Sequence, residues 1–165
     1  MPDWRVELLD ADDYPAETGG TYADNARAKA LYGRRVGPPG AWIAGEDSGI
    51  EVEALGGRPG VESARWADDP IAALLAELEG VQDRRARYVC AIVAVSPGGD
   101  EVDALGTLEG QIAFEPRGSG GFGYDPIFVP TGEERTVAEL GDDWKRAHSH
   151  RARAASALSA ALGAS

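Results

Sequence analysis

Alternation of apolar and polar side chains predicts strands in the first third of the chain. Residues 4–8 (WRVEL) and 50–55 (IEVEAL) alternate with the period of a half-buried strand, and the apolar run at 41–44 predicts a further short strand. Residues 21–35 are rich in alanine and carry basic residues near their C-terminal end. They predict a helix that Thr21 caps and that the following GPPG ends.

The rest of the chain mixes strands and helices. A helix is predicted from Pro70 to Gly80, and strands over 87–96 and 102–114 flank the turn PGGD. Thr136 and Glu139 fit a capping box, and an alanine-rich helix is predicted over 142–162. Hairpins and helical crossovers together predict an α/β fold with a central mixed sheet.

Length and charge narrow the function. A chain of 165 residues fits a single domain, 1–165, with a real core. Its net charge of -12, from 28 acidic and 16 basic residues, repels phosphate backbones, so no nucleic-acid partner is expected. The acidic N-terminus is unlike a signal peptide, and no apolar run approaches the roughly 18 residues of a membrane span. We therefore expect a cytoplasmic protein without a membrane partner, in which Cys90, within an apolar run, is a buried and inert thiol.

The stretch GEDSG at 45–49 is the first candidate site. Glu46 and Asp47 lie where an apolar strand is predicted to end, and Glu17 offers another carboxylate. Such oxygen-only groups suit Mg²⁺ or Mn²⁺. The alternative is that Glu46 and Asp47 cap a turn and stay solvated.

A glycine-rich stretch, RGSGGFGYDPIF at 117–128, is the second candidate. It matches G-x-G-x-x-G, but extended chain follows where a dinucleotide-binding turn needs a helix. Phe122 could stack on a base while Asp125 accepts from a ring N–H. The alternative is a hairpin whose aromatic side chains return to the core.

A basic stretch, WKRAHSHR at 144–151, is the third candidate. Lys145, Arg146 and Arg151 bring positive charge into an acidic chain, and His150 adds a donor or acceptor. Helical spacing would place Lys145 and Ser149 on one face. The alternative is an ordinary solvated helix face.

Together with a fourth stretch, residues 17–30, these three stretches resemble the ordered motifs of a known protein family. The segments ETGGTYADNARAKA (17–30), EDSG leading to LGGRPGVESAR (46–65), GSGGFGYDPIF (118–128) and KRAHSHR (145–151) are similar to the RdgB-type inosine/xanthosine triphosphate pyrophosphatases. The resemblance implies a two-lobed fold around a mixed sheet, with a nucleotide cleft between the lobes and frequent homodimers. It also implies Mg²⁺-dependent hydrolysis of ITP, dITP and XTP to monophosphate and pyrophosphate.

The resemblance implies a role for individual residues as well. Asp47 matches the general base, Glu17 a metal ligand, and Glu46 a carboxylate near the metal. The implied substrate contacts are Ser48, Phe122, Gly123, Tyr124, Asp125, Lys145, His150 and Arg151, with Asn25 and Lys29 on the phosphate side. A 6-oxopurine presents an acceptor at C6 where adenine presents a donor, so Arg151 can favour hypoxanthine and xanthine.

The chain departs from the family pattern at its start. The family opens with a strand, a [ST]-G-N-x-x-K loop that grips the triphosphate, and a helix, whereas about three residues precede Trp4 here. We expect exposed apolar surface and an unpaired strand as a result. Either Met1 is a misplaced start of an ordinary pyrophosphatase, or the short chain is real. In the second case it is a catalytically weak or inactive nucleotide-binding relative, or an interaction protein that borrows the missing element from a partner. Glu46 is a smaller departure, because the family commonly has aspartate there.

Overall fold

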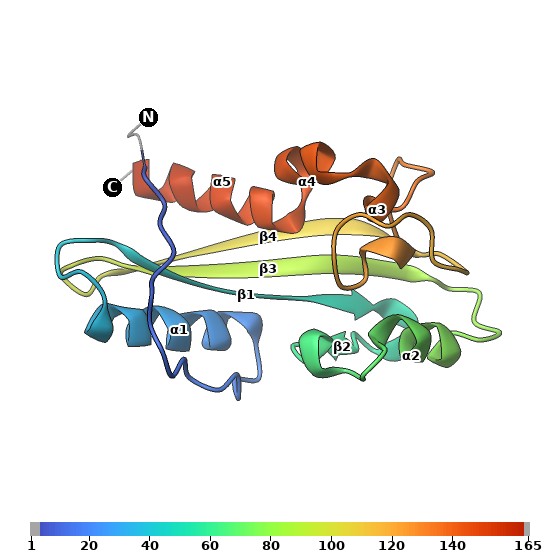
Figure 1. Cartoon of the computed structure of the whole chain (residues 1–165), viewed down its shortest axis with the longest axis horizontal. Helices are drawn as coiled ribbons and strands as arrows, with labels where there is room; N and C mark the ends of the chain where they lie inside the picture. The colour runs from blue at the N-terminus through green and yellow to red at the C-terminus, as the bar shows by residue number, and fades with distance from the viewer. Residues whose placement is uncertain (1–3, 164–165) are drawn as a thin grey trace. The chain divides into compact units, whose positions relative to one another are not determined.

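The computed structural model describes residues 4–163 and contains a five-stranded sheet with helices (Figure 1). The strands are β1 (Ile43–Val52), β2 (Pro59–Gly60), β3 (Arg85–Val95), β4 (Glu101–Ile112) and β5 (Phe128–Pro130). The helices are α1 (Tyr22–Val36), α2 (Pro70–Glu77), α3 (Val137–Leu140), α4 (Asp142–His148) and α5 (His150–Gly163), and single 3₁₀ turns cover Glu53–Leu55, Ser63–Arg65 and Asp125–Ile127. The predicted α/β class is confirmed.

The sheet is antiparallel, whereas the sequence predicted a mixed one. Its strand order is β2-β1-β3-β4-β5, with Ile50 opposite Gly60 and Gln111 opposite Val129 in its two edge pairs. A parallel pair needs a crossover that returns the chain to the end of the sheet where the first strand began. Here α2 leads the chain into β3, which runs back along β1 in the opposite direction, so no such crossover forms.

The described residues form two compact units. Unit 1 contains residues 4–47, 90–106 and 154–163, and unit 2 contains residues 48–89 and 107–153. The division falls within β1, β3, β4 and α5. Two units agree with the two-lobed fold that the resemblance implied, while a single domain over 1–165 stays a prediction.

In unit 1, α1 packs closely against β1. Thr21 Oγ1 accepts a hydrogen bond from Asp24 N at 3.1 Å and begins the helix, as predicted. Ala26 and Ala30, one turn apart on the helix, are fully buried. Gly45 of β1 faces them so closely that an added Cβ would lie 2.6 Å from the Ala30 nitrogen. The small side chains on both elements therefore allow the helix and the strand to touch.

In unit 2, the core lies against the sheet. Its buried members are Ile50, Val52, Leu74, Leu78, Ala86, Tyr88, Leu108, Ile112, Tyr124, Ile127, Phe128 and Val137. Helix α2 begins at Pro70, as predicted, and Asp69 Oδ1 caps it by accepting from Ala72 N at 3.0 Å. The predicted capping box is also present, with Thr136 and Glu139 each accepting from the other's backbone N–H at the start of α3. Helix α3 leads into α4, and Thr136 Oγ1 also donates to the main-chain oxygen of Arg117 at 2.7 Å, so this cap contacts the start of the glycine-rich stretch.

The strand predicted near the N-terminus is wrong. Residues 4–19 contain no helix or strand, and the side chains of Val6 and Leu8 are 89% and 101% exposed. Alternation makes a strand only where a neighbouring strand satisfies its backbone N–H and C=O groups. Val6 and Leu8 are therefore exposed on a segment without regular structure, and the surface expected to lack cover by an N-terminal strand and helix stays a prediction.

Two other boundaries differ from prediction. The two short strands expected on either side of GEDSG are one continuous strand, β1, and Glu53–Leu55 at its end is a 3₁₀ turn. The helix expected over 142–162 is two helices, because Ser149 is extended and its Oγ accepts from Ala152 N at 3.1 Å. Lys145 and Ser149 consequently do not share a helix face. No helix found between residues 4 and 163 is long and apolar enough to cross a membrane.

The contact between α1 and β1 makes Gly45→Ala a destabilising change. The added methyl group would press against the helix backbone, and overpacking of this kind lowers the free energy of unfolding by about 1–3 kcal/mol. Urea unfolding measures the difference. Gly40→Ala is the matched control, because no atom lies within 4 Å of its added Cβ. Equal unfolding midpoints for the two variants would contradict this packing.

The capping box predicts a pH dependence. The backbone hydrogen bond from Thr136 lowers the pKa of Glu139, so the folded state favours its carboxylate. The resulting stability is present above the unfolded pKa and is lost as the pH falls through the lower, folded pKa. Thermal unfolding of wild-type protein and Glu139→Gln should therefore differ at pH 7 and converge toward pH 3. Glu79→Gln, which changes an exposed glutamate outside any cap, is the control.

Candidate functional site

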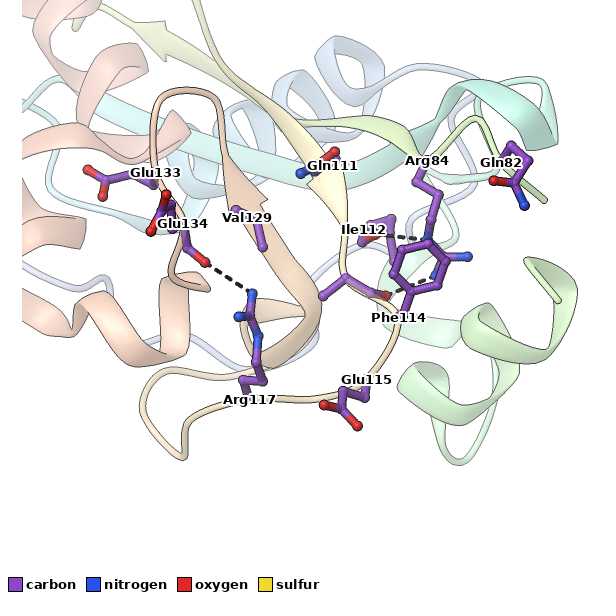
Figure 2. A pocket seen from close by; sticks show the side chains of 11 residues that line it. Gln82, Arg84, Gln111, Ile112, Phe114, Glu115, Arg117, Val129, Glu133 and Glu134 are labelled. Atoms are coloured by element: carbon purple, nitrogen blue, oxygen red, sulfur yellow. Dashed lines mark hydrogen bonds between the residues drawn. The ribbon is translucent and has the colours of Figure 1, made fainter. Parts of the chain in front are cut away.

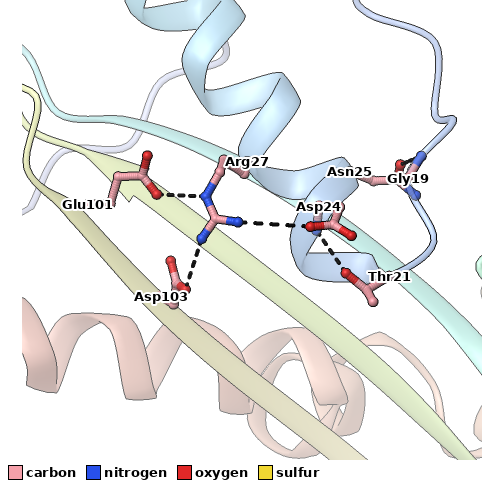
Figure 3. A network of polar contacts seen from close by, with 7 residues as sticks. All are labelled: Gly19, Thr21, Asp24, Asn25, Arg27, Glu101 and Asp103. Carbon is pink, nitrogen blue, oxygen red and sulfur yellow. Dashed lines mark hydrogen bonds and ion pairs between the residues drawn. The ribbon is translucent and has the colours of Figure 1, made fainter.

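Asp47 is a buried carboxylate within β1. Its neighbours along the strand alternate between the two faces, and Asp47 itself is 6% exposed. Asn25 of α1 donates from Nδ2 to Asp47 Oδ2 at 2.8 Å. The other end of the Asn25 amide accepts from Gly19 N, also at 2.8 Å (Figure 3). The asparagine is thus fixed at both ends and presents its donor to the carboxylate.

Lys29 lies one helical turn after Asn25 and brings two carboxylates together. Its ammonium forms an ion pair with Glu17, lies 3.7 Å from Asp47 Oδ1, and donates to the main-chain oxygen of Glu46 at 2.9 Å. One positive charge therefore serves both Glu17 and Asp47. Of the predicted phosphate-side and metal residues, three side chains are therefore assembled around Asp47, those of Asn25, Lys29 and Glu17.

The side chain of Glu46 points elsewhere. Consecutive residues of a strand project to opposite faces, and the Glu46 carboxylate accepts from the Cys90 thiol at 3.4 Å. Cys90 is buried, as predicted. The alternative in which Glu46 and Asp47 cap a solvated turn is wrong, because both lie within a continuous strand and Asp47 is buried.

On another side of α1, Arg27 joins the helix to β4. Its guanidinium meets Glu101 at 2.7 Å, Asp103 at 3.4 Å and Asp24 at 4.0 Å (Figure 3). The hydrogen bond to Glu101 is the main cause of the raised pKa of Arg27. These carboxylates are exposed or half-buried and already contact a cation, so they supply control positions for the buried group around Asp47.

A cavity of about 220 Å³ in unit 2 collects the other predicted residues. All eight line it: Ser48, Phe122, Gly123, Tyr124, Asp125, Lys145, His150 and Arg151. They come from β1, the glycine-rich loop, α4 and α5. Six more residues, which sequence reasoning did not select, complete the lining: Gly49, Ile50, Ser63, Ala64, Pro70 and Tyr88.

Asp125 is the buried carboxylate of this cavity, at 4% exposure. Its Oδ2 accepts from Lys145 Nζ at 2.6 Å and from Phe122 N at 3.0 Å. Gly121 has φ +71°, and an added Cβ there would overlap Asp125 Oδ2. The glycine is therefore needed both for the backbone conformation and for the close approach of the carboxylate.

The aromatic side chains of the glycine-rich loop take different positions. Phe122 is 64% exposed, with Lys145 Nζ 4.2 Å and Arg151 Cζ 5.3 Å from its ring centroid. Arg151 also donates to Ser48 Oγ at 2.9 Å. Tyr124 is buried, as the core alternative expected, and burial raises its pKa to about 12. The loop thus offers one ring to a ligand and anchors itself with the other.

Tyr88 of β3 is a site residue that sequence reasoning missed. Its hydroxyl donates to Asp125 Oδ1 at 3.1 Å, and its ring stacks on His150 with centroids 4.6 Å apart and planes 11° apart. Burial, followed by the charge of Asp125, raises the pKa of Tyr88 well above its ordinary value. A tyrosine within the apolar run of a buried strand is typical of a core residue, so the sequence contains no signal for this contact.

A second cavity, of about 510 Å³, lies elsewhere in unit 2 (Figure 2). Its buried Arg84 donates to three main-chain oxygens, those of Leu78, Ile112 and Ala113. The Phe114 ring lies over the guanidinium, with Arg84 Cζ 4.4 Å from the ring centroid. Three glutamates, Glu115, Glu133 and Glu134, also line this cavity. Their charge opposes a polyphosphate, so the larger cavity suits a nucleoside triphosphate less than the smaller one does.

The donor set around Asp47 fits a hard cation only in part. Between residues 4 and 163, no three His, Cys, Asp or Glu side chains form a group that could hold a metal ion. Glu17 and Asp47 offer oxygen ligands around a shared ammonium. Two carboxylates suffice for Mg²⁺, which commonly retains waters and binds substrate phosphates.

Known proteins resemble this chain over most of its length. The sequence model of the Ham1 family matches residues 2–161. A protein of Deinococcus deserti named dITP/XTP pyrophosphatase is 45% identical over 96% of this chain and 78% of its own length. The structure of the Staphylococcus aureus Ham1 protein matches with a TM-score of 0.83 and 37% identity, over 99% of this chain and 82% of that chain.

A further structure agrees with this match. It is that of a nucleoside-triphosphatase / dITP/XTP pyrophosphatase from Mycobacterium abscessus, with a TM-score of 0.73 and 45% identity over 92% of this chain and 80% of that chain. Agreement of the family model, relatives above 40% identity and solved structures leaves one conclusion. The chain belongs to the Ham1 family.

Proposed function

We propose that this protein is a nucleoside triphosphate pyrophosphatase that hydrolyses ITP, dITP and XTP to the monophosphate and pyrophosphate. Support comes from relatives named dITP/XTP pyrophosphatase at 42–51% identity. The observation that carries the proposal is that one cavity is lined by an exposed aromatic ring, a buried carboxylate and cationic side chains. This combination matches the edge of a 6-oxopurine.

The cavity would recognise the base by its pattern of donors and acceptors. Phe122 would stack on the purine ring. The Asp125 carboxylate, which can only accept hydrogen bonds, would accept one from the N1–H of hypoxanthine or xanthine. Arg151 or Lys145, which donate only, would meet the oxygen at C6. Adenine presents an acceptor at N1 and a donor at C6, so both contacts would become repulsive. Gly123 and Tyr124 would shape the loop, while Ser48 and His150 complete the contacts.

Asp47 would be the general base. Its carboxylate would take a proton from water, whose oxygen forms a bond to the α-phosphorus as the bond to the bridging oxygen of pyrophosphate breaks. Asn25 would hold Asp47 in place, and Lys29 would offset the charge of the phosphates. Ser48, which lines the cavity proposed to bind the purine, is the residue that follows Asp47 in the sequence.

Mg²⁺ is the cofactor we propose, with Glu17 and Asp47 as its ligands from the chain. Bound there, it would offset phosphate charge in the transition state. Lys29 would then move its contacts from these carboxylates toward the phosphates. Glu46 as a carboxylate near the metal stays a prediction, because its side chain lies on the other face of β1 and meets Cys90.

Two more expectations belong to this proposal, the oligomeric state implied by the resemblance and the location expected from the N-terminal sequence. The protein would act as a homodimer, and it would act in the cytoplasm, where nucleoside triphosphates are made and used. Its partner would be the small-molecule substrate, with neither nucleic acid nor a membrane bound. These statements are predictions that rest on the sequence.

Pyrophosphate release tests the activity. With Mg²⁺, we expect release from ITP and XTP and much less from ATP, whose N1 acceptor and C6 donor oppose the contacts proposed for the base. Asp47→Asn should lower the rate by about 10²-fold or more, because the amide cannot accept the proton from water. Asp103→Asn is the control, since it changes an exposed carboxylate paired with Arg27. Equal rates for wild type and Asp47→Asn, or no release from ITP, would contradict the proposal.

Metal removal tests the cofactor. EDTA should abolish pyrophosphate release, and added Mg²⁺ should restore it. Glu17→Gln should raise the Mg²⁺ concentration that gives half-maximal activity by about tenfold or more, because it removes a charged ligand. Asp103→Asn should leave this concentration unchanged. If EDTA has no effect, the metal assignment is wrong even where the activity is present.

A further inference from the structure

The acceptor capacity of Asp125 is almost used up within the protein. A carboxylate has about four lone-pair positions, two on each oxygen. Lys145 Nζ and Phe122 N, at 2.6 and 3.0 Å, occupy both positions on Oδ2. Tyr88 Oη, at 3.1 Å, occupies one position on Oδ1. The position left for a ligand therefore lies on Oδ1, beside the tyrosine hydroxyl.

We propose that Tyr88 is a positioning residue that sets base selectivity, by directing the last acceptor position of Asp125 toward the base. This inference rests on the proposed function, in that it takes the ligand to be a 6-oxopurine nucleotide. The hydroxyl of Tyr88 donates its single proton to Asp125, so it holds Oδ1 in one orientation. Without that bond, the carboxylate could rotate about the contacts at Oδ2, and Oδ1 would no longer face the N1–H.

The ring of Tyr88 makes a separate contribution. It stacks on His150 at 4.6 Å and packs against Phe128 at 4.5 Å, so it is held rigidly between a site residue and the core. The raised pKa of Tyr88 agrees with this arrangement, because the hydroxyl stays protonated and keeps its donor. Replacement by phenylalanine preserves the ring and removes only the hydroxyl. It therefore isolates the effect on Asp125.

Equilibrium binding of IMP and AMP to the full chain tests the inference without turnover. Tyr88→Phe should lower the ratio of IMP to AMP affinity about tenfold, as expected for the loss of one hydrogen bond to a charged group. With Mg²⁺ and ITP, KM should rise while kcat at saturation stays unchanged, because base binding is the same in the ground and transition states. An unchanged affinity ratio, or a fall in kcat at constant KM, would overturn the assignment.

A matched control separates positioning from loss of stability. Ser96→Ala also removes a buried hydroxyl that donates to a carboxylate, the 3.3 Å bond from Ser96 Oγ to Asp100 Oδ2, in unit 1 and outside the residues that line the cavity. It should lower the thermal unfolding midpoint and leave the IMP to AMP ratio as in wild type. If the control lowers the ratio as much as Tyr88→Phe does, the effect is general destabilisation and the inference is wrong.

A double-mutant cycle tests whether Tyr88 acts through Asp125. In an Asp125→Asn background, Tyr88→Phe should have little further effect on the affinity ratio, whereas an additive effect would contradict the mechanism. The binding and turnover experiments also separate the two proposals. If the wild type releases no pyrophosphate but the affinity ratio shifts in Tyr88→Phe, only the proposed activity fails. If it releases pyrophosphate and the ratio does not shift, only the role of Tyr88 fails.

Discussion

A buried carboxylate must be met by hydrogen-bond donors, and this constraint organises both units of the protein. An ionised group away from water is tolerated only where donors or opposite charges replace its hydration. Asp47 meets this requirement in unit 1 through the amide of Asn25 and the ammonium of Lys29. Asp125 meets it in unit 2 through Lys145, a backbone N–H and the hydroxyl of Tyr88. The need to pair these two carboxylates therefore constrains the positions of α1 in unit 1 and of β3 and α4 in unit 2.

Glycine makes the close approaches possible. Gly45 lets α1 come near enough to β1 for side chains of the helix to reach Asp47. Gly121 leaves room for the Asp125 carboxylate and adopts a left-handed conformation that suits glycine. The absence of a side chain gives space to the backbone of α1 at Gly45 and to a buried acid at Gly121. The glycine content of these two motifs thus has a steric explanation beside the functional one.

Each unit supplies a different kind of chemistry. Around Asp47 the side chains are carboxylates, an amide and an ammonium, which suit water, metal and phosphate. Around Asp125 the groups are an exposed ring, cations and a hydroxyl, which suit a flat heterocycle with a polar edge. The membership of the Ham1 family and this division of chemistry lead to the same proposed reaction. Asp47 belongs to the first group of side chains and Ser48 to the second, and the two residues are consecutive in the sequence.

The sequence by itself determined the motifs, the family they resemble, the α/β class and most helix boundaries. These depend on residue type and short spacing, as the caps at Thr21, Asp69 and Thr136 illustrate. Tertiary structure decided what depends on neighbours distant in the sequence. It left residues 4–8 without strand pairing, continued β1 through GEDSG, and broke the last helix at Ser149. It also brought Tyr88 to Asp125, 37 residues away, because packing between elements, and not local pattern, sets which side chains share a buried charge.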